Sequence, residues 1–221
     1  MFAAVLSEIG SRMLSSERLL ANVATVEETA QESAAIMKGL CFIQMYGIYE
    51  YTVRSSVQAA LSSLKNGVLR INQIRREVLC LVLDPRWDAA AQASPARMWE
   101  CRMDLMNQAH SDELAASFNE TLFPLDGSHY RARQLHTIWK VLGLVAPVVP
   151  EPRFLGRIEE MVENRNAIAH GRRTPEDVGR SYSRLDIEER FADLKRICDH
   201  ILVTLEAHCN AGGLLDEAGS T

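Results

Sequence analysis

Several signatures of common enzyme classes are missing from this chain of 221 residues. Neither a Cys-x-x-Cys pair nor His-Glu-x-x-His occurs, and these spacings are typical of zinc sites. A Gly-rich phosphate loop and a Gly-x-Ser-x-Gly turn are missing as well. We therefore expect no metal and no cofactor. The five cysteines lie within apolar helical patterns, which is typical of reduced thiols in a cytoplasmic protein rather than of a disulfide framework: Cys41, Cys80, Cys101, Cys198 and Cys209.

Long apolar runs are also lacking. The longest candidate, residues 139–149, is too short to span a bilayer and is interrupted by Gly143 and Pro147. The first residues show no basic region followed by an apolar core, so we expect neither a secretory signal nor a membrane partner. The net charge of −5 argues against broad, sequence-independent coating of nucleic acid, but it is compatible with a small basic cleft.

The composition suffices for one good hydrophobic core, because 47% of the residues are apolar. We expect a single helical domain over residues 1–210. Residues 84–119 are a candidate insertion within it. Residues 211–221 are expected to form a flexible C-terminal tail.

Apolar residues recur at helical spacing through nearly the whole chain, and the alternation typical of strands is absent. The pattern predicts an all-α protein. Thr25 and Glu28 have the spacing of a capping box, which predicts that the second and longest helix begins there. The alanine-rich stretch 84–95 is expected to be a loop. The expected helices cover residues 2–20, 25–65, 69–83, 95–106, 112–122, 131–144, 152–170 and 187–208, with one short turn after Thr174.

The most informative segment is Glu-Asn-Arg-Asn-Ala-Ile-Ala-His-Gly, residues 163–171. Arg165 offers a permanently charged fork suited to phosphate, and His170 is the side chain that changes charge nearest neutral pH. Gly171 predicts a left-handed helix end, which makes His170 the terminal residue and turns its ring toward Arg165. Asn166 lies one turn before His170 and shares its face. A purely structural interpretation stays open, because the helix dipole favours a C-terminal histidine by roughly 0.3–1 kcal/mol.

The chain provides an internal control for this spacing. Arg131 and His136 repeat the separation of Arg165 and His170, but without the asparagine, the alanine and the glycine. The repeat lies within an apolar helical pattern, so we expect His136 to face solvent or a packed neighbour. A helical histidine without convergent partners is a poor signal of a site.

A second polar feature lies in the long second helix. Glu50 and Arg54 are four residues apart within a tyrosine-rich, otherwise apolar stretch. We expect Glu50 to be buried there, and buried carboxylates need a partner. Two alternatives remain at this point: Glu50 belongs to a functional site, or it only neutralises Arg54.

The letters Arg-Asn-x-x-Ala-His-Gly resemble the active-site motif of the HEPN superfamily, and residues 40–61 resemble the second helix of its MAE-type members, with an aromatic-x-x-x-Glu pattern. The resemblance implies an up-and-down helical bundle that dimerises with the two motifs facing each other. It also implies a metal-independent endoribonuclease of a toxin or phage-defence system, with a cognate antitoxin or operon partner. Cleavage would proceed by attack of the RNA 2′-hydroxyl and leave 2′,3′-cyclic phosphate and 5′-hydroxyl ends.

The same resemblance implies a role for each site residue. His170 would act as general acid or base, and Arg165 would stabilise charge on the phosphate. Asn166 would orient His170 or bind the phosphate, and Glu50 would lie near the motif and pair with Arg165 or His170. Arg172 and Arg173 would hold the flanking RNA backbone.

Two rival interpretations come from other classes of protein. One is a non-catalytic HEPN-like module that acts as an interaction or regulatory subunit of a defence operon. The other is a generic helical scaffold in which the motif is accidental. Function resides in the site and not in the fold, so the geometry around Arg165 has to discriminate between them.

Overall fold

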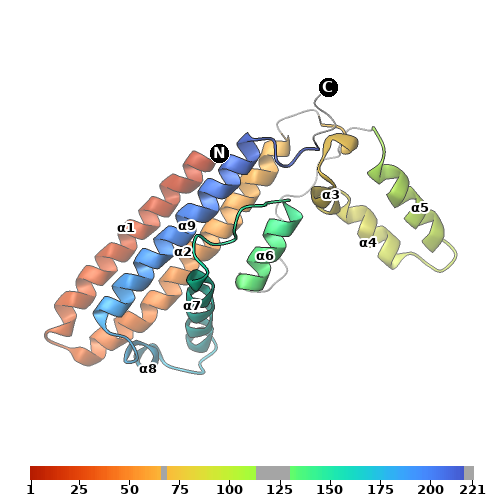
Figure 1. The fold of residues 1–221 in the computed structure, drawn as a ribbon. Helices are drawn as coiled ribbons and strands as arrows, with labels where there is room; N and C mark the ends of the chain where they lie inside the picture. The colour runs from red at the N-terminus through yellow and green to blue at the C-terminus, as the bar shows by residue number, and fades with distance from the viewer. Residues whose placement is uncertain (66–68, 113–129, 217–221) are drawn as a thin grey trace. The chain divides into compact units, whose positions relative to one another are not determined.

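The computed structural model describes residues 1–65, 69–112 and 130–216 (Figure 1). Within these ranges the chain forms nine α-helices and a short 3-10 helix, and no strand. This confirms the predicted all-α class. The elements in chain order are α1 (Phe2–Glu27), α2 (Gln31–Lys65), η1 (Ile71–Gln73), α3 (Arg76–Val82), α4 (Asp84–Gln92), α5 (Met98–Ala109), α6 (Ala132–Val141), α7 (Arg153–Ala169), α8 (Pro175–Gly179) and α9 (Arg184–Asn210).

Several helix boundaries differ from the expectation: the helix expected at 69–83, for example, is divided into η1 and α3. Two of the differences have a plain physical reason. The capping box at Thr25 is wrong: its hydroxyl donates to the carbonyl of Ala21 at 3.2 Å inside α1, and α2 begins only at Gln31. The loop expected at 84–95 is wrong as well, because Asp84–Gln92 is helix α4. Alanine is the strongest helix former, and Pro85 is compatible with the first turn of a helix. The helix expected at 112–122 lies outside the described residues, apart from Asp112.

The chain divides into two compact units. The first unit comprises Met1–Ser56, Ser128–Leu135 and Pro147–Thr204, and the second comprises Val57–Gly127, His136–Ala146 and Leu205–Thr221. The single domain expected over residues 1–210 stays a prediction.

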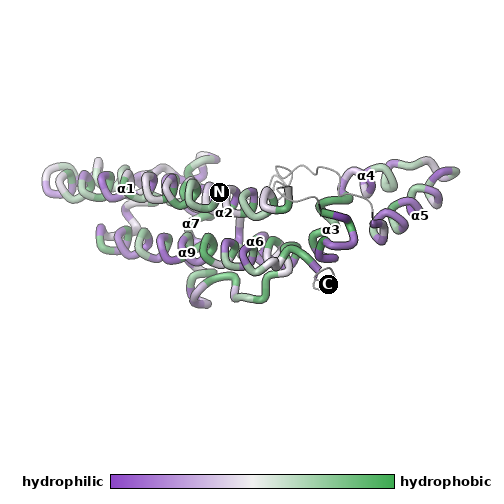
Figure 2. Tube along the Cα trace, turned by 90° about the horizontal axis from the view of Figure 1, so that it is seen from above, coloured by the Kyte–Doolittle hydropathy of each residue, from purple (hydrophilic) through white to green (hydrophobic). Residues whose placement is uncertain are grey.

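The core of the first unit lies between α1, α2, α7 and α9. Hydrophobic and hydrophilic residues follow one another along α1 and α9 (Figure 2). Buried apolar residues recur at helical spacing on α1 and α7, for example, which gives each of these two helices a buried face. Aromatic rings of α2 meet its neighbours: the ring of Tyr51 lies 4.2 Å from the guanidinium carbon of Arg12 on α1, and Tyr46 and Phe42 meet α7 and the segment after α8. The largest buried side chains of this core include Phe42, Met45, Tyr49, Phe154, Ile158, Ile187 and Ile197.

Helix α8 packs directly against the backbone of α2 through two glycines. A Cβ atom on Gly39 would lie 1.9 Å from the carbonyl oxygen of Pro175, and one on Gly179 would lie 1.8 Å from that of Ala35. Thr174 caps α8 by accepting from the backbone N–H of Asp177 at 3.1 Å. This close crossing holds the segment that follows residues 163–171 against α2.

The second unit contains η1, α3, α4, α5 and the chain's described end. His208 Nε2 lies 2.8 Å from the carbonyl oxygen of Leu142, and Ile74 and Leu215 form an isolated antiparallel bridge. Within residues 211–216 of the expected tail, Leu214 is buried in this unit, and residues 217–221 lie outside the described residues. No described helix has the length and apolar character needed to cross a membrane.

Candidate functional site

Helix α7 ends where the sequence predicts. His170 is its C-cap, and Gly171 follows with φ of +67°. The Gly171 N–H donates to the carbonyl of Ile168 at 3.0 Å, and the Arg172 N–H donates to that of Ala167 at 2.8 Å. Bonds of this kind close a helix on a left-handed residue. The predicted helix end is thus confirmed, and it places His170 at the C-terminal pole of α7.

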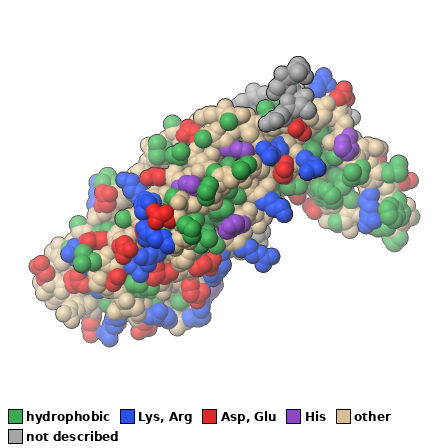
Figure 3. Space-filling view, in the orientation of Figure 1, with side chains coloured by type: hydrophobic (Ala, Val, Ile, Leu, Met, Phe, Trp, Pro, Cys, Tyr) green, Lys and Arg blue, Asp and Glu red, His purple; other side chains and the backbone are tan. Residues whose placement is uncertain are grey.

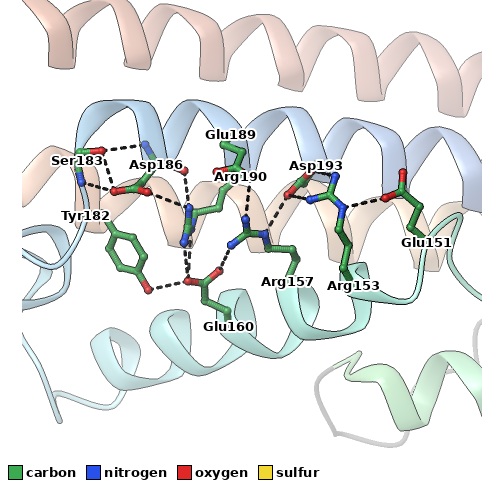
Figure 4. A network of polar contacts seen from close by, with 10 residues as sticks. All are labelled: Glu151, Arg153, Arg157, Glu160, Tyr182, Ser183, Asp186, Glu189, Arg190 and Asp193. Atoms are coloured by element: carbon green, nitrogen blue, oxygen red, sulfur yellow. Dashed lines mark hydrogen bonds and ion pairs between the residues drawn. The ribbon is translucent and has the colours of Figure 1, made fainter.

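An ion-pair network fixes the N-terminal part of α7 to α9 (Figure 4). Asp193 on α9 is only 4% exposed and accepts from both Arg153, at 3.0 and 3.2 Å, and Arg157, at 2.9 Å. Arg157 also lies 3.3 Å from Glu160 and 3.0 Å from Glu189. A buried carboxylate needs such partners, because loss of its hydration is costly.

The network continues toward the motif through Tyr182, in the segment between α8 and α9. Its hydroxyl donates to Glu160 at 3.0 Å and accepts from the amide of Asn164 at 2.9 Å (Figure 4 shows the bond to Glu160). Arg190 binds Glu160 at 3.0 Å and lies over the Tyr182 ring at 4.8 Å. Asn164 is therefore fixed directly beside Arg165 in the sequence.

Arg165 has a different environment from the other arginines of α7. Its Nη1 donates to Oδ1 of Asn166 at 2.9 Å, and its guanidinium carbon lies 4.7 Å from the centre of the Tyr46 ring. No carboxylate within the described ranges forms an ion pair with it. Asn166 is 6% exposed, and Arg165 is half-buried. The structure thus brings Arg165 and Asn166 together, with the amide oxygen oriented to the arginine.

Glu50 contacts this group only through Tyr46. The Tyr46 hydroxyl donates to Oε1 of Glu50 at 3.3 Å. Burial, together with the negative charge of Glu50, raises the pKa of Tyr46 to about 12, although the charge of Arg165 opposes the shift. The expectation that Glu50 is buried is wrong, because the residue is exposed. It directly follows the fully buried Tyr49 on α2, and successive side chains of a helix point in different directions. An ion pair with Arg54 is not formed either, as far as the described residues show.

The imidazole of His170 is exposed, and none of the described side chains bonds to it. Its backbone N–H donates to the carbonyl of Asn166 at 3.0 Å. A contact between the imidazole and Arg165 or the amide of Asn166 stays a prediction. The ring is accessible to a ligand or to another chain.

The two arginines after Gly171 are engaged by the protein itself. Arg172 lies 2.8 Å from Glu163, and Arg173 donates to the carbonyl of Asp177 at 2.6 Å and to Ser181 at 3.3 Å. Arg172 lowers the pKa of the Glu163 carboxyl through its hydrogen bond. On the face of the first unit seen in Figure 3, Lys and Arg are interspersed with Asp and Glu rather than gathered in one basic surface.

Arg131 and His136, which have the same spacing as Arg165 and His170, lie in a segment with a structural role. Arg131 binds Glu159 at 2.5 Å and Glu163 at 3.3 Å, so it connects the segment before α6 to α7. His136 is exposed, as expected. Arg131 therefore supports the motif helix through carboxylates, in contrast to Arg165.

The sequence assigns no role to Tyr46, Asn164 or Tyr182. Tyr46 is the aromatic residue of the aromatic-x-x-x-Glu pattern, and its place one turn before Glu50 is the signal for a bond between its hydroxyl and that carboxylate. Nothing local marks Asn164 or Tyr182, because their contact joins two segments through the tertiary fold. Among the described side chains, no group of three or more His, Cys, Asp or Glu is arranged to hold a metal ion.

Comparison with known protein families identifies a family for this chain. The family model described as HEPN_MAE_28990/-like HEPN matches residues 4–210. No curated protein and no solved structure matches the chain. HEPN domains are generally ribonuclease-like and often function as dimers. Because the match covers nearly the whole chain, which has the all-α fold described above, this protein belongs to the MAE-type HEPN family.

Proposed function

We propose that this protein is a metal-independent endoribonuclease of a toxin or phage-defence system. The single observation that supports this best is the environment of Arg165. Its guanidinium is held by an aromatic ring and an amide, while no described carboxylate neutralises it. Exposed His170 ends the same helix. A cation without a described carboxylate partner and an exposed imidazole at the end of the same helix are the two groups that this cleavage of a phosphodiester requires.

In the proposed reaction the RNA 2′-hydroxyl attacks the adjacent phosphorus atom. A bond forms between the 2′-oxygen and phosphorus while the bond from phosphorus to the 5′-oxygen breaks, which leaves a 2′,3′-cyclic phosphate and a 5′-hydroxyl. One His170 accepts the proton of the 2′-hydroxyl, and another protonates the leaving oxygen. Arg165 stabilises the charge that builds on the non-bridging oxygens. Arg172 and Arg173 contact the flanking phosphates once RNA displaces their present partners.

The need for two imidazoles supports a homodimer in which the two motifs form one composite site. Each chain supplies one exposed His170, so a twofold arrangement places a base and an acid on opposite sides of one phosphate. A cognate antitoxin or operon partner would then control the activity by covering this site. Sedimentation or light scattering of wild type decides whether a dimer exists.

The decisive experiment compares wild type with His170→Ala and His136→Ala on total RNA and transfer RNA in EDTA. His136→Ala is the matched control, because it removes an exposed histidine at the same spacing from an arginine. We expect His170→Ala to lower the cleavage rate by about 10²–10⁴-fold and His136→Ala to leave it unchanged. The products should carry cyclic phosphate ends. Equal cleavage by wild type and His170→Ala would reject this function.

A second candidate is a non-catalytic HEPN module that regulates an operon partner. The observation in its favour is that Arg172 and Arg173 are bound to groups of their own chain, in a protein of net charge −5. RNA left intact by wild type, with a stable complex formed with the product of a neighbouring gene, would support this candidate.

A further inference from the structure

The side chain of Arg165 can adopt many orientations unless the fold restricts it. It is long and flexible, and an arginine used for phosphate recognition gains from being held in one orientation before the ligand arrives. A carboxylate would hold it, as Asp193 holds Arg153 and Arg157, but would occupy its N–H donors and neutralise its charge.

We infer that Tyr46 is the positioning residue for Arg165 and that Glu50 acts through Tyr46 rather than on Arg165 or His170. The inference deepens the proposed function and rests on it. Tyr46 lies on α2 and Arg165 on α7, so the contact is made by tertiary packing. It changes the role given to Glu50 by the family resemblance, because Glu50 touches the tyrosine hydroxyl and not the cation.

The geometry suits an aromatic support. The guanidinium carbon lies 4.7 Å from the ring centre, within the range of a cation–π contact. Such a contact uses the flat face of the guanidinium and leaves its N–H edges available. Among the described contacts, Nη1 alone is engaged at an edge, by Oδ1 of Asn166 at 2.9 Å. Arg165 is thus held at one face and one edge, and no bond to its other N–H donors is formed by the described residues.

The support itself is rigid. Tyr46 is 2% exposed, and its ring packs against that of the fully buried Tyr49, with centres 6.4 Å apart and planes inclined by 59°. Glu50 accepts from the hydroxyl at the far end of the ring. A buried ring fixed at its hydroxyl has little freedom to rotate, so its face is a fixed reference for Arg165. Glu50 fits this arrangement because it is exposed and lies one turn after Tyr46.

The test uses Tyr46→Leu, which removes the ring, Tyr46→Phe, which removes only the hydroxyl, and Glu50→Gln. The chain offers a control in Tyr51→Leu, because the ring of Tyr51 on the same helix also lies against an arginine, Arg12, at 4.2 Å, and that arginine is bound by Glu8 as well. In single-turnover cleavage with enzyme in saturating excess over RNA, we expect Tyr46→Leu to lower the rate constant by roughly 10²-fold, while the enzyme concentration that gives half the maximal rate changes little. Tyr46→Phe and Glu50→Gln should retain most of the activity, and Tyr51→Leu all of it. Equal losses in Tyr46→Leu and Tyr51→Leu, or no loss in Tyr46→Leu, would overturn the inference.

A second readout does not depend on cleavage. The side-chain Nε–Hε resonance of Arg165, assigned by its disappearance in Arg165→Lys, should show the upfield ring-current shift of a proton above an aromatic face. The shift should be kept in Tyr46→Phe and in Tyr51→Leu. Its absence in wild type overturns the inference even if Tyr46→Leu does not fold. If wild type shows the shift but cleaves no RNA, the ribonuclease proposal fails while the positioning contact stands.

Discussion

The two ends of helix α7 use arginine in opposite ways. Near its N-terminus, Arg153 and Arg157 are bound by carboxylates, chief among them the buried Asp193 (Figure 4). Near its C-terminus, Arg165 rests on the ring of Tyr46 and has no carboxylate partner among the described residues. The same side chain serves at one end to join two helices and at the other to present a charge.

The difference shows how a bundle can hold a cation ready without neutralising it. Ion pairs to Asp193 fix the position of α7 but use up the donors that make them. A ring restricts the guanidinium without competing for those donors. Variants at the two ends of α7 should therefore separate stability from activity.

The largest expected effect is on catalysis at the C-terminal end. Arg165→Ala should lower RNA cleavage by about 10²–10³-fold while the melting temperature hardly changes. Arg157→Ala should do the reverse, because Arg157 binds Asp193, 2.9 Å away, and takes no part in the proposed mechanism. Single-turnover cleavage and thermal melting of both variants test this. Loss of cleavage in folded Arg157→Ala would break the comparison.

The next effect concerns stability at the N-terminal end. Asp193→Asn keeps the shape but removes the charge that Arg153 and Arg157 share. We expect a loss of roughly 2 kcal/mol in the free energy of unfolding, which is a decrease of about 4–8 °C in melting temperature for a chain of this size. The exposed Asp199→Asn on the same helix is the control and should change little. Cleavage per folded molecule should stay that of wild type in both.

A smaller effect distinguishes the helix end from the helix interior. Gly171→Ala forces a side chain into a left-handed conformation, with φ of +67°, and should cost about 1–2 kcal/mol of stability. Gly156→Ala, inside α7, should instead stabilise by about 0.5–1 kcal/mol, because a Cβ atom there would have open space within 4 Å. Chemical denaturation of the two variants measures both values. Similar values would show that the end of α7 is unstrained.

The smallest effect is a pH dependence at Tyr46. Its pKa is raised from the ordinary 10.0 to about 12, so the folded state favours the neutral hydroxyl. That contribution to stability is complete below pH 10 and is lost as the pH rises through the folded pKa of about 12. The tyrosinate absorbance of wild type minus that of Tyr46→Phe should reveal one hydroxyl titrating in this window. If the difference in absorbance instead develops around pH 10, the ordinary pKa of tyrosine, the Tyr46 hydroxyl is open to water.

The sequence predicted the features that depend on local chemistry. The end of α7 follows from Gly171, and the all-α class follows from apolar periodicity, so both are confirmed. The capping box at Thr25 failed because Thr-x-x-Glu also occurs inside helices, where the hydroxyl binds the carbonyl one turn back. The loop over 84–95 failed because alanine favours a helix even where no apolar stripe marks a buried face.

The candidate site was predicted in its residues but not in its connections. Arg165, Asn166 and His170 were chosen from the motif, whereas the link from Arg165 to Glu50 through Tyr46 depends on how α7 crosses α2. Helix periodicity gives the face of each residue to within a residue or so. Tyr46 and Glu50 lie one turn apart on nearly the same face of α2, yet Tyr46 is buried and Glu50 is exposed.

Glycine is required in the first unit for two different reasons, lack of space and a left-handed backbone conformation. Gly39 and Gly179 have no room for a side chain, because carbonyl oxygens occupy the Cβ position. At Gly171 a Cβ atom would have no other atom within 4 Å. What disfavours other residues there is the positive φ, which L-amino acids rarely adopt. Protein semisynthesis could therefore place D-alanine at residue 171, where a mirror-image centre would fit the helix end and restrict the unfolded chain more than glycine does. The turn that exposes His170 is thus a constraint of chirality, whereas the crossing of α8 over α2 is a constraint of space.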